Sequence, residues 1–303
     1  MIQAKVYTDS IPFSISDVET RQDPKRVLMC SPDHFDIVDE KNVHMAGNIG
    51  QTNREAVAQQ WQQLKDAYDG LKQRGVLEEV AVIPGGEGCE DMVFCANQTL
   101  PYRKKDGSEV VVMSKMRHES RQREVPHFEA FFAGKGFKPL HFKNATLFEG
   151  MGDVIPHPGK ALLYGGYGHR TGIEAYHELA EMLETPIVAL ELVSPKFYHL
   201  DTCFVPLSPD SVMLCKEAFS ETGLKTIQQL FKTVHFVPED EAVKYFSLNA
   251  HAFAANGHKA AILQSGSTVT KKILEDEGFE VTEIETGEFM KSGGSVFCMK
   301  MMY

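Results

Sequence analysis

The sequence predicts an α/β fold in which one unit, strand–strand–helix–strand, is used five times. Three observations support this prediction: five amphipathic helical stretches, a short β-rich run after each of them, and helix starts that recur at intervals of roughly 50 residues. Repeats of that length usually mark supersecondary units that pack on one another rather than independent domains. Because no Pro-, Gly- or Ser-rich linker interrupts the chain, we expect one domain over residues 1–303.

Apolar spacing defines the five predicted helices. In the first, from about Asn53 to Gly75, apolar side chains recur at steps of three and four residues, which is the period of one helix face. Thr52 and Glu55 form a predicted capping box at its start, and Gly75 is expected to end it. The other four helices are predicted to start near Arg121, Gly172, Glu221 and Thr268.

Strand candidates surround these helices. The runs that follow the helices are rich in β-branched and aromatic residues, which favour strands. They cover residues 77–83, 137–142, 187–193, 234–237 and 279–284. The last four helices are also preceded by pairs of strand candidates, among them 92–95 with 110–113, 199–207 with 211–215, and 246–253 with 259–263.

One position of the unit carries a chemically functional residue in successive repeats. At or just before the first strand of each unit stand Asp91, Glu149, His199, Asn249 and, in the final strand, Cys298. Their separations are 58, 50, 50 and 49 residues. If five such strands surround one axis, these side chains converge at one end of it. The alternative for any single position is a polar residue that merely forms a turn before a strand.

Composition excludes several classes of function. The chain carries 31 Lys and Arg against 42 Asp and Glu, a net charge of −11, whereas nucleic acids and anionic membranes select basic surfaces. No apolar run approaches the roughly 18 residues of a membrane span, and the N-terminus lacks a secretory signal. Six cysteines without a CxxC or CxxH pair predict neither a disulfide framework nor a zinc site. We therefore expect a cytoplasmic protein that binds a small molecule and needs no metal.

Around the five residues of the repeated position the sequence resembles the guanidine-modifying enzymes of the pentein fold. That group includes arginine deiminase, dimethylarginine dimethylaminohydrolase, arginine dihydrolase and the amidinotransferases. The matching segments follow the family's order and cover residues 91–97, 120–125, 148–153, 199–204 and 291–298. The resemblance implies a five-bladed α/β propeller of ββαβ units around a pseudo-fivefold axis, in agreement with the repeat count. It also implies chemistry on a guanidino group without a cofactor.

The residue types fit that chemistry. A guanidinium carbon is electron-rich and planar, so its attack needs a strong nucleophile, and a thiolate whose pKa is lowered by a neighbouring cation meets that need. Cys298 is the predicted nucleophile, and the glycine pair 293–294 before it lets a substrate approach the backbone. His199 is the predicted general acid and base, and Glu149 is expected to orient His199 and to balance its charge.

Carboxylates are the natural partners of a bound guanidinium, because its planar donors match them in a fork geometry. The resemblance assigns this role to Asp91 and Asp201. Asn97 stands where some members of the family carry Asp, which predicts a different set of contacts around the guanidinium.

The α-carboxylate of an arginine-like substrate needs a cation. Arg170, together with Arg121 or Arg123, matches the carboxylate-binding segments of the family. These arginines are therefore predicted to bind the amino-acid end of the substrate.

A segment near the N-terminus looks most like the arginine dihydrolase branch, in which an Asn is implicated in taking citrulline on to ornithine. Asn42 stands at that position, whereas Val43 and His44 stand where the branch usually has Pro and Trp. A second hydrolytic step is therefore an open alternative.

Three functions remain open from the sequence. The first is a hydrolase that acts on the guanidino group of arginine or a close derivative and releases a ureido product. The second is an amidinotransferase that passes the same covalent intermediate to an amine. The third is a non-catalytic pentein, which the presence of Cys298 and His199 argues against. The oligomeric state is not predicted.

Overall fold

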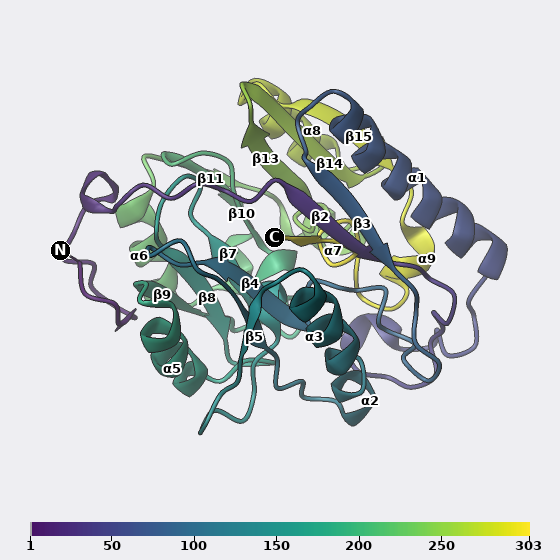
Figure 1. The fold of residues 1–303 in the computed structure, drawn as a ribbon. Helices are drawn as coiled ribbons and strands as arrows, with labels where there is room; N and C mark the ends of the chain where they lie inside the picture. The colour runs from purple at the N-terminus through teal and green to yellow at the C-terminus, as the bar shows by residue number, and fades with distance from the viewer. Residues whose placement is uncertain (1) are drawn as a thin grey trace.

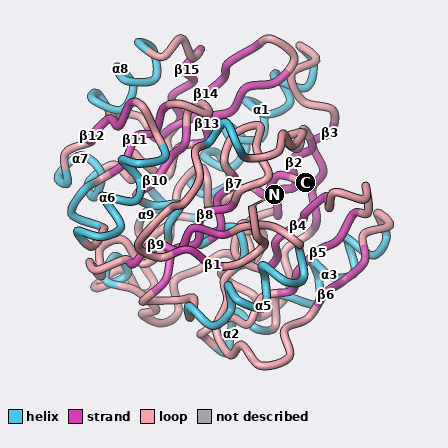
Figure 2. Tube along the Cα trace, turned by 90° about the vertical axis from the view of Figure 1, so that its left-hand side faces the viewer, coloured by secondary structure: helices cyan, strands magenta, loops and turns pink. Residues whose placement is uncertain are grey.

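The computed structural model describes residues 2–303, which form five small β-sheets arranged around a common centre (Figure 1). The longer helices lie at the periphery of this ring and the strands lie in its middle, as the view turned by 90° also shows (Figure 2). Each sheet with its helix is one blade. The five predicted repeats and the α/β propeller fold of the penteins are confirmed.

The blades share one strand arrangement. The sheets comprise β16, β2 and β3 (Met301–Met302, Arg26–Cys30, Glu79–Ile83); β4, β5 and β6 (Thr99–Arg103, Glu109–Met113, Lys138–Leu140); β7, β8 and β9 (Val154–Pro156, Leu163–Tyr167, Ile187–Glu191), with β1 (Val6–Tyr7) added; β10, β11 and β12 (Phe204–Pro206, Ser211–Leu214, Thr233–Phe236); and β13, β14 and β15 (His251–Ala255, His258–Gln264, Glu280–Ile284). In every blade the first two of these strands are antiparallel and the last two are parallel. A parallel pair needs a crossover connection, and the helix of each unit supplies it.

The helices lie close to their predicted positions. The crossover helices are α1 (Arg54–Gln73), α3 (Val125–Gly134), α5 (Ile173–Leu183), α6 (Glu221–Leu230) and α8 (Thr268–Asp276). Shorter turns are α2 (Glu119–Gln122), α4 (Gly150–Asp153), α7 (Glu239–Lys244), α9 (Gly287–Met290) and the 3-10 segments Ile15–Asp17, Val43–Met45, Leu200–Thr202 and Lys216–Ala218. On α1 the predicted apolar face is buried, and the Trp61 indole donates to the Cys30 carbonyl at 2.8 Å.

Four local predictions were wrong. The cap of α1 is Asn53, whose side chain accepts from the amides of Glu55 and Ala56, and not Thr52. Residues 92–95 form turns rather than a strand, and the first strand of that blade, β4, begins only at Thr99. Residues 246–250 likewise form a turn before β13, and residues 200–202 of the predicted strand 199–207 form a 3-10 turn before β10. At 92–95 and 246–250 the buried apolar stretch has the composition of a strand but forms the loop that leads into the innermost strand.

The chain closes on itself. Its last strand, β16, pairs with β2 of the first blade in the register Met301 to Leu28. This closure gives the first blade its innermost strand from the other end of the sequence. It places Cys298, three residues before β16, at the position that other blades fill with loop residues before their own first strand. Within residues 2–303 no helix has the length and apolar character to cross a membrane.

Candidate active site

The five residues at the repeated position of the unit lie in the loops that lead into the innermost strands. Asp91 precedes β4, Glu149 precedes α4 and β7, His199 precedes β10, Asn249 precedes β13, and Cys298 precedes β16. All five are buried, with at most 2% of each residue exposed. Buried polar groups need partners, and the partners of these five are mostly one another and their neighbours in the same loops.

The buried pair His199 and Glu149 has the geometry of a base and its orienting acid. The His199 Nε2 atom lies 2.7 Å from Glu149 Oε2, and Arg170 donates to the same oxygen at 3.1 Å. The other carboxylate oxygen accepts from the backbone amide of Arg117 at 2.9 Å. Burial alone would raise the pKa of Glu149, but Arg170 and the hydrogen bond with His199 hold it well below its usual range. Glu149 is therefore ionised.

The ionised Glu149 fixes the tautomer of His199. Burial lowers the pKa of His199 to about 4 even though Glu149 opposes this shift, so the ring is neutral at neutral pH. A carboxylate only accepts hydrogen bonds, so the ring proton sits on Nε2. His199 Nδ1 is buried and has no hydrogen-bond partner in the described structure, which leaves its lone pair available to take a proton.

Gly152, in α4, brings His199 close to Asn97. A Cβ atom on Gly152 would lie 3.3 Å from His199 Cγ and only 2.2 Å from Asn97 Nδ2. No side chain fits there, so the backbone of α4 lies against both the imidazole and the amide. Asn97 in turn receives a hydrogen bond from Arg121 at 2.9 Å.

Cys298 is held as a neutral thiol. Its Sγ atom donates to Asp201 Oδ2 at 3.2 Å and accepts from Asn249 Nδ2 at 3.2 Å. Burial and the Asp201 carboxylate raise the pKa of Cys298 well above its ordinary value. The expectation of a cation next to this thiol is therefore not met: the groups that contact the sulfur are a carboxylate and an amide. Burial also raises the pKa of Asp201 to about 7.

One small cavity collects most of the predicted substrate-binding residues. It has a volume of about 20 Å³, which is room for about one water molecule. The predicted site residues that line it are Asn42, Asp91, Asn97, Arg121, Arg170 and Cys298. His199, Glu149 and Asp201 lie behind this lining and contact it through Tyr198, Arg170 and Cys298 respectively.

The two arginines of the 120–125 segment differ. Arg121 is buried and donates to Glu124, to Asn97 and to two backbone carbonyls, so its guanidinium holds the cavity wall together. Arg123 lies outside the cluster: its side chain is 63% exposed and is 3.9 Å from Glu119. Residues two apart on a helical turn point to opposite sides, so only one of them faces the cavity.

Several lining residues were not predicted. Lys41 and Ser292 both contact Asp91, and Tyr198 stacks against Arg170, whose guanidinium carbon is 4.8 Å from the ring centroid. The Tyr198 hydroxyl also donates to the carbonyl of Gly293. None of these residues occupies the repeated position before a first strand. The one signal in the sequence is that two of them stand next to a predicted site residue: Lys41 precedes Asn42, and Tyr198 precedes His199.

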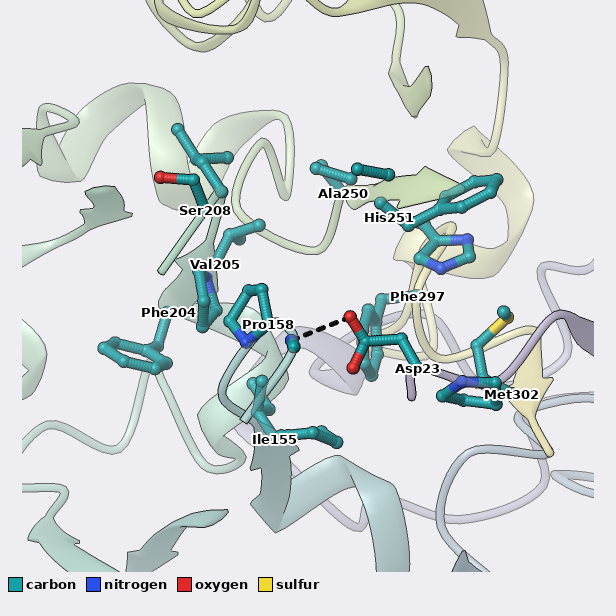
Figure 3. A pocket seen from close by; sticks show the side chains of 18 of the residues that line it. Asp23, Ile155, Pro158, Phe204, Val205, Ser208, Ala250, His251, Phe297 and Met302 are labelled. Carbon is teal, nitrogen blue, oxygen red and sulfur yellow. Dashed lines mark hydrogen bonds between the residues drawn. The ribbon is translucent and has the colours of Figure 1, made fainter. Parts of the chain in front are cut away.

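A larger cavity lies elsewhere. It has a volume of about 340 Å³ and is lined mainly by apolar residues of β7, β10 and β13, with Asp23 among the polar residues that line it (Figure 3). The dashed line in Figure 3 is the hydrogen bond from the Gly159 amide to Asp23 at 2.9 Å. None of the ten predicted site residues lines this cavity, so size alone does not locate the candidate chemistry.

Five ββαβ blades whose inner loops bring together a cysteine, a histidine and several carboxylates define a protein of the pentein superfamily. The chain belongs to the family described as N,N dimethylarginine dimethylhydrolase, eukaryotic, whose model matches residues 31–302.

Relatives of known name agree with this family. The chain is 32% identical over 282 residues to the bifunctional arginine dihydrolase/ornithine cyclodeaminase ArgZ of Synechocystis sp.. This matched region covers 92% of this chain and 38% of ArgZ. It is 30% identical over 239 residues to the N(G),N(G)-dimethylarginine dimethylaminohydrolase of Mycobacterium tuberculosis, covering 79% of this chain and 73% of that protein. It thus spans less than half the length of ArgZ.

A solved structure shows the same likeness in three dimensions. The N-terminal domain of a variant of ArgZ, covalently bound to a reaction intermediate, superposes with a TM-score of 0.82 at 32% identity. The superposition covers 91% of this chain and 97% of that domain. The part of ArgZ that this chain resembles is therefore that N-terminal domain.

Proposed function

We propose that this protein is a hydrolase that cleaves a guanidino C–N bond of arginine or a close derivative through a covalent intermediate on Cys298. The observation that carries the proposal is a small cavity that Cys298 and Asp91 line, with a neutral imidazole, the ionised acid that orients it and the Asp201 carboxyl directly behind this lining. The names of the relatives support it, because arginine dihydrolase and dimethylarginine dimethylaminohydrolase both act on such groups.

The carboxylates explain why a guanidinium is the favoured substrate. Asp91 lines the cavity, and Asp201 lies 3.2 Å from the sulfur, so a planar cation between them would present its carbon to Sγ. The cation would also bring a positive charge to the thiol. A charge of that sign favours the thiolate that burial and Asp201 disfavour, and so the substrate itself activates Cys298.

His199 moves the protons. In the first half-reaction Sγ attacks the guanidinium carbon, the thiol proton passes to His199 Nδ1, and that proton leaves with the departing amine. In the second, water attacks the S-amidino carbon and gives one proton to His199 Nδ1, the C–S bond breaks, and that proton returns to the sulfur. The remaining water proton passes to solvent as the ureido carbonyl forms. Glu149 stabilises the imidazolium formed in both halves, because its carboxylate lies 2.7 Å from Nε2.

Arg170 is the arginine that we assign to the substrate carboxylate. Both arginines line the cavity, but Arg121 engages all three of its nitrogens, with Glu124, Asn97 and two carbonyls, whereas Arg170 engages two, with Glu149 and the Lys41 carbonyl, and stacks on Tyr198. Asn42 lines the same cavity and donates to the Ser292 carbonyl at 3.0 Å, which keeps it beside any ureido product. Its amide is therefore the group whose replacement tests a second hydrolysis.

Product analysis tests the proposal. Purified protein is incubated separately with arginine, dimethylarginine, agmatine and citrulline, and the released amines and ureido products are quantified, with Cys298→Ser as the inactive control. The proposal expects ammonia or a methylamine and a ureido product from at least one guanidine, and none from the control. Full turnover by Cys298→Ser overturns the mechanism. Transfer of the amidino group to added glycine or ornithine instead of water overturns the assignment as a hydrolase.

A further inference from the structure

The buried ammonium group of Lys41 is paired with Asp91, the carboxylate that we assign to the substrate guanidinium. Lys41 is only 2% exposed in its side chain, and its Nζ atom lies 3.0 Å from Asp91 Oδ2 and 3.9 Å from Glu90 Oε1. It also forms a short hydrogen bond with Asp39. The approach to Asp91 is an ion pair without hydrogen-bond geometry, because Oδ2 has no hydrogen-bond partner.

Lys41 is charged in this position. Burial favours the neutral amine, but Asp91 and Asp39 outweigh that effect and raise the pKa of Lys41. The cavity that Lys41 shares with Asp91 and Cys298 holds about one water molecule, so a guanidinium does not fit beside the ammonium. Substrate and Lys41 therefore compete for one carboxylate.

We propose that Lys41 is an internal counter-cation that pairs with Asp91 and Asp39 together, as in this structure, and keeps only Asp39 when a guanidinium takes its place on Asp91. This inference rests on the proposed function. Asp39 suits the outer position because its side chain is 55% exposed and lies two residues from Lys41 on the same loop. The ammonium thus keeps an acidic partner in both positions, and its four-carbon stem is flexible enough to move between them.

The loop that carries Lys41 stays anchored while its side chain moves. Arg170 donates to the Lys41 carbonyl at 2.8 Å, Asn42 donates to Ser292, and His44 contacts the Lys196 carbonyl at 3.0 Å. These contacts fix the backbone of residues 41–44 from three sides. Only the Lys41 side chain needs to leave the cavity for a substrate to enter.

The exchange makes the site sensitive to charge. A guanidinium replaces the ammonium on Asp91 with another cation, so the carboxylate stays paired. A ureido product is uncharged and leaves Asp91 without a cation, so the return of Lys41 displaces it. Lys41 is thus a specificity-determining residue that favours cationic substrates and promotes release of the product after one hydrolysis.

Binding measurements separate this proposal from the proposed function. Calorimetric titrations with arginine and with citrulline use Cys298→Ser protein, which needs no turnover, alone and combined with Lys41→Met, Lys41→Arg or Asp39→Asn. If Lys41 occupies Asp91 in about nine of ten empty molecules, its removal tightens arginine binding about tenfold, because only the open fraction binds ligand. Citrulline binding tightens as well. Lys41→Arg retains the competing charge and gives no such gain.

Asp39→Asn is the opposite perturbation. It removes the outer partner of Lys41, so the ammonium stays on Asp91 and arginine binding weakens several-fold. Weaker arginine binding by Lys41→Met, or tighter binding by Asp39→Asn, in proteins with unchanged unfolding temperatures overturns the exchange. Absence of turnover in the wild-type protein would overturn the proposed function and leave these binding results interpretable.

Discussion

Replacement of Glu149 by Gln is the sharpest single test of the proposed proton chemistry. The substitution keeps the size of the side chain and a carbonyl oxygen that accepts from His199, but it removes the negative charge. For His199 the charge matters when the ring becomes an imidazolium, which the mechanism requires in both half-reactions. The expected defect is therefore in the rate of turnover and not in the binding of the guanidinium.

The structure sets the size of that defect. At the 2.7 Å that separates His199 Nε2 from Glu149 Oε2, two unit charges attract by about 6 kcal/mol at an effective dielectric constant of about 20. The amide carbonyl of Gln retains part of this interaction, so a loss of about 2–4 kcal/mol is expected, which is about 30- to 1,000-fold in kcat. Arg170 also loses its anionic partner, which costs about 3–5 kcal/mol of folding free energy.

Single-turnover kinetics with arginine, together with denaturant unfolding, measure both quantities. Glu124→Gln is the matched control, because Glu124 is an equally buried acid paired with an arginine but does not contact His199. Burial already raises the pKa of Glu124 to about 7, so its neutralisation is expected to cost less. A Glu149→Gln protein that is folded and retains kcat within about threefold of wild type would refute the role of the pair.

Three further predictions follow from particular contacts. Burial raises the pKa of Asp201 to about 7, so its carboxyl must lose a proton to bind a cation. KM for arginine is therefore expected to fall as the pH rises from about 6 to about 8, and Asp201→Asn should abolish this dependence. A flat wild-type profile would contradict the prediction. Asn249→Ala leaves two buried backbone amides without the acceptor that they contact at 3.0 and 3.2 Å. It should lower the free energy of unfolding by about 1–3 kcal/mol and also lower kcat. A variant with wild-type stability and activity would show that the Asn249 side chain does not position the Cys298 loop. Gly152→Ala places a methyl group 2.2 Å from Asn97 Nδ2 and 3.3 Å from His199 Cγ, so kcat should fall by about tenfold or more with unchanged circular dichroism; unimpaired turnover would mean that the imidazole and the amide need not lie so close.

The repeat and the site's register were predictable from the sequence because both depend on local periodicity. Apolar spacing located the helices within a few residues, and the interval near 50 residues identified the position that Glu149, His199 and Cys298 share. The closure of the first blade by β16 could not be read from such spacing. It depends on pairing between Leu28 and Met301, which are separated by nearly the whole chain.

The finer features of the site depend on packing that no local pattern records. Lys41 stands in a loop with no repeat partner, and only the fold brings its ammonium to Asp91. Arg121 and Arg123 are equivalent as sequence, yet a helical turn buries one and exposes the other. The thiol of Cys298 was expected next to a cation, whereas the structure surrounds it with Asp201 and an amide.

The most direct measurement is the mass of the protein during turnover. Wild-type protein is mixed with arginine, quenched in acid within milliseconds to seconds, digested and mapped by mass spectrometry, with Cys298→Ser as the control that forms no adduct. We expect an amidino group with its substrate chain, less one departing amine, on the peptide that contains Cys298 and on no other cysteine peptide. Steady product formation with Cys298 unmodified at every time point, or an adduct on a different cysteine, would contradict covalent catalysis at this residue.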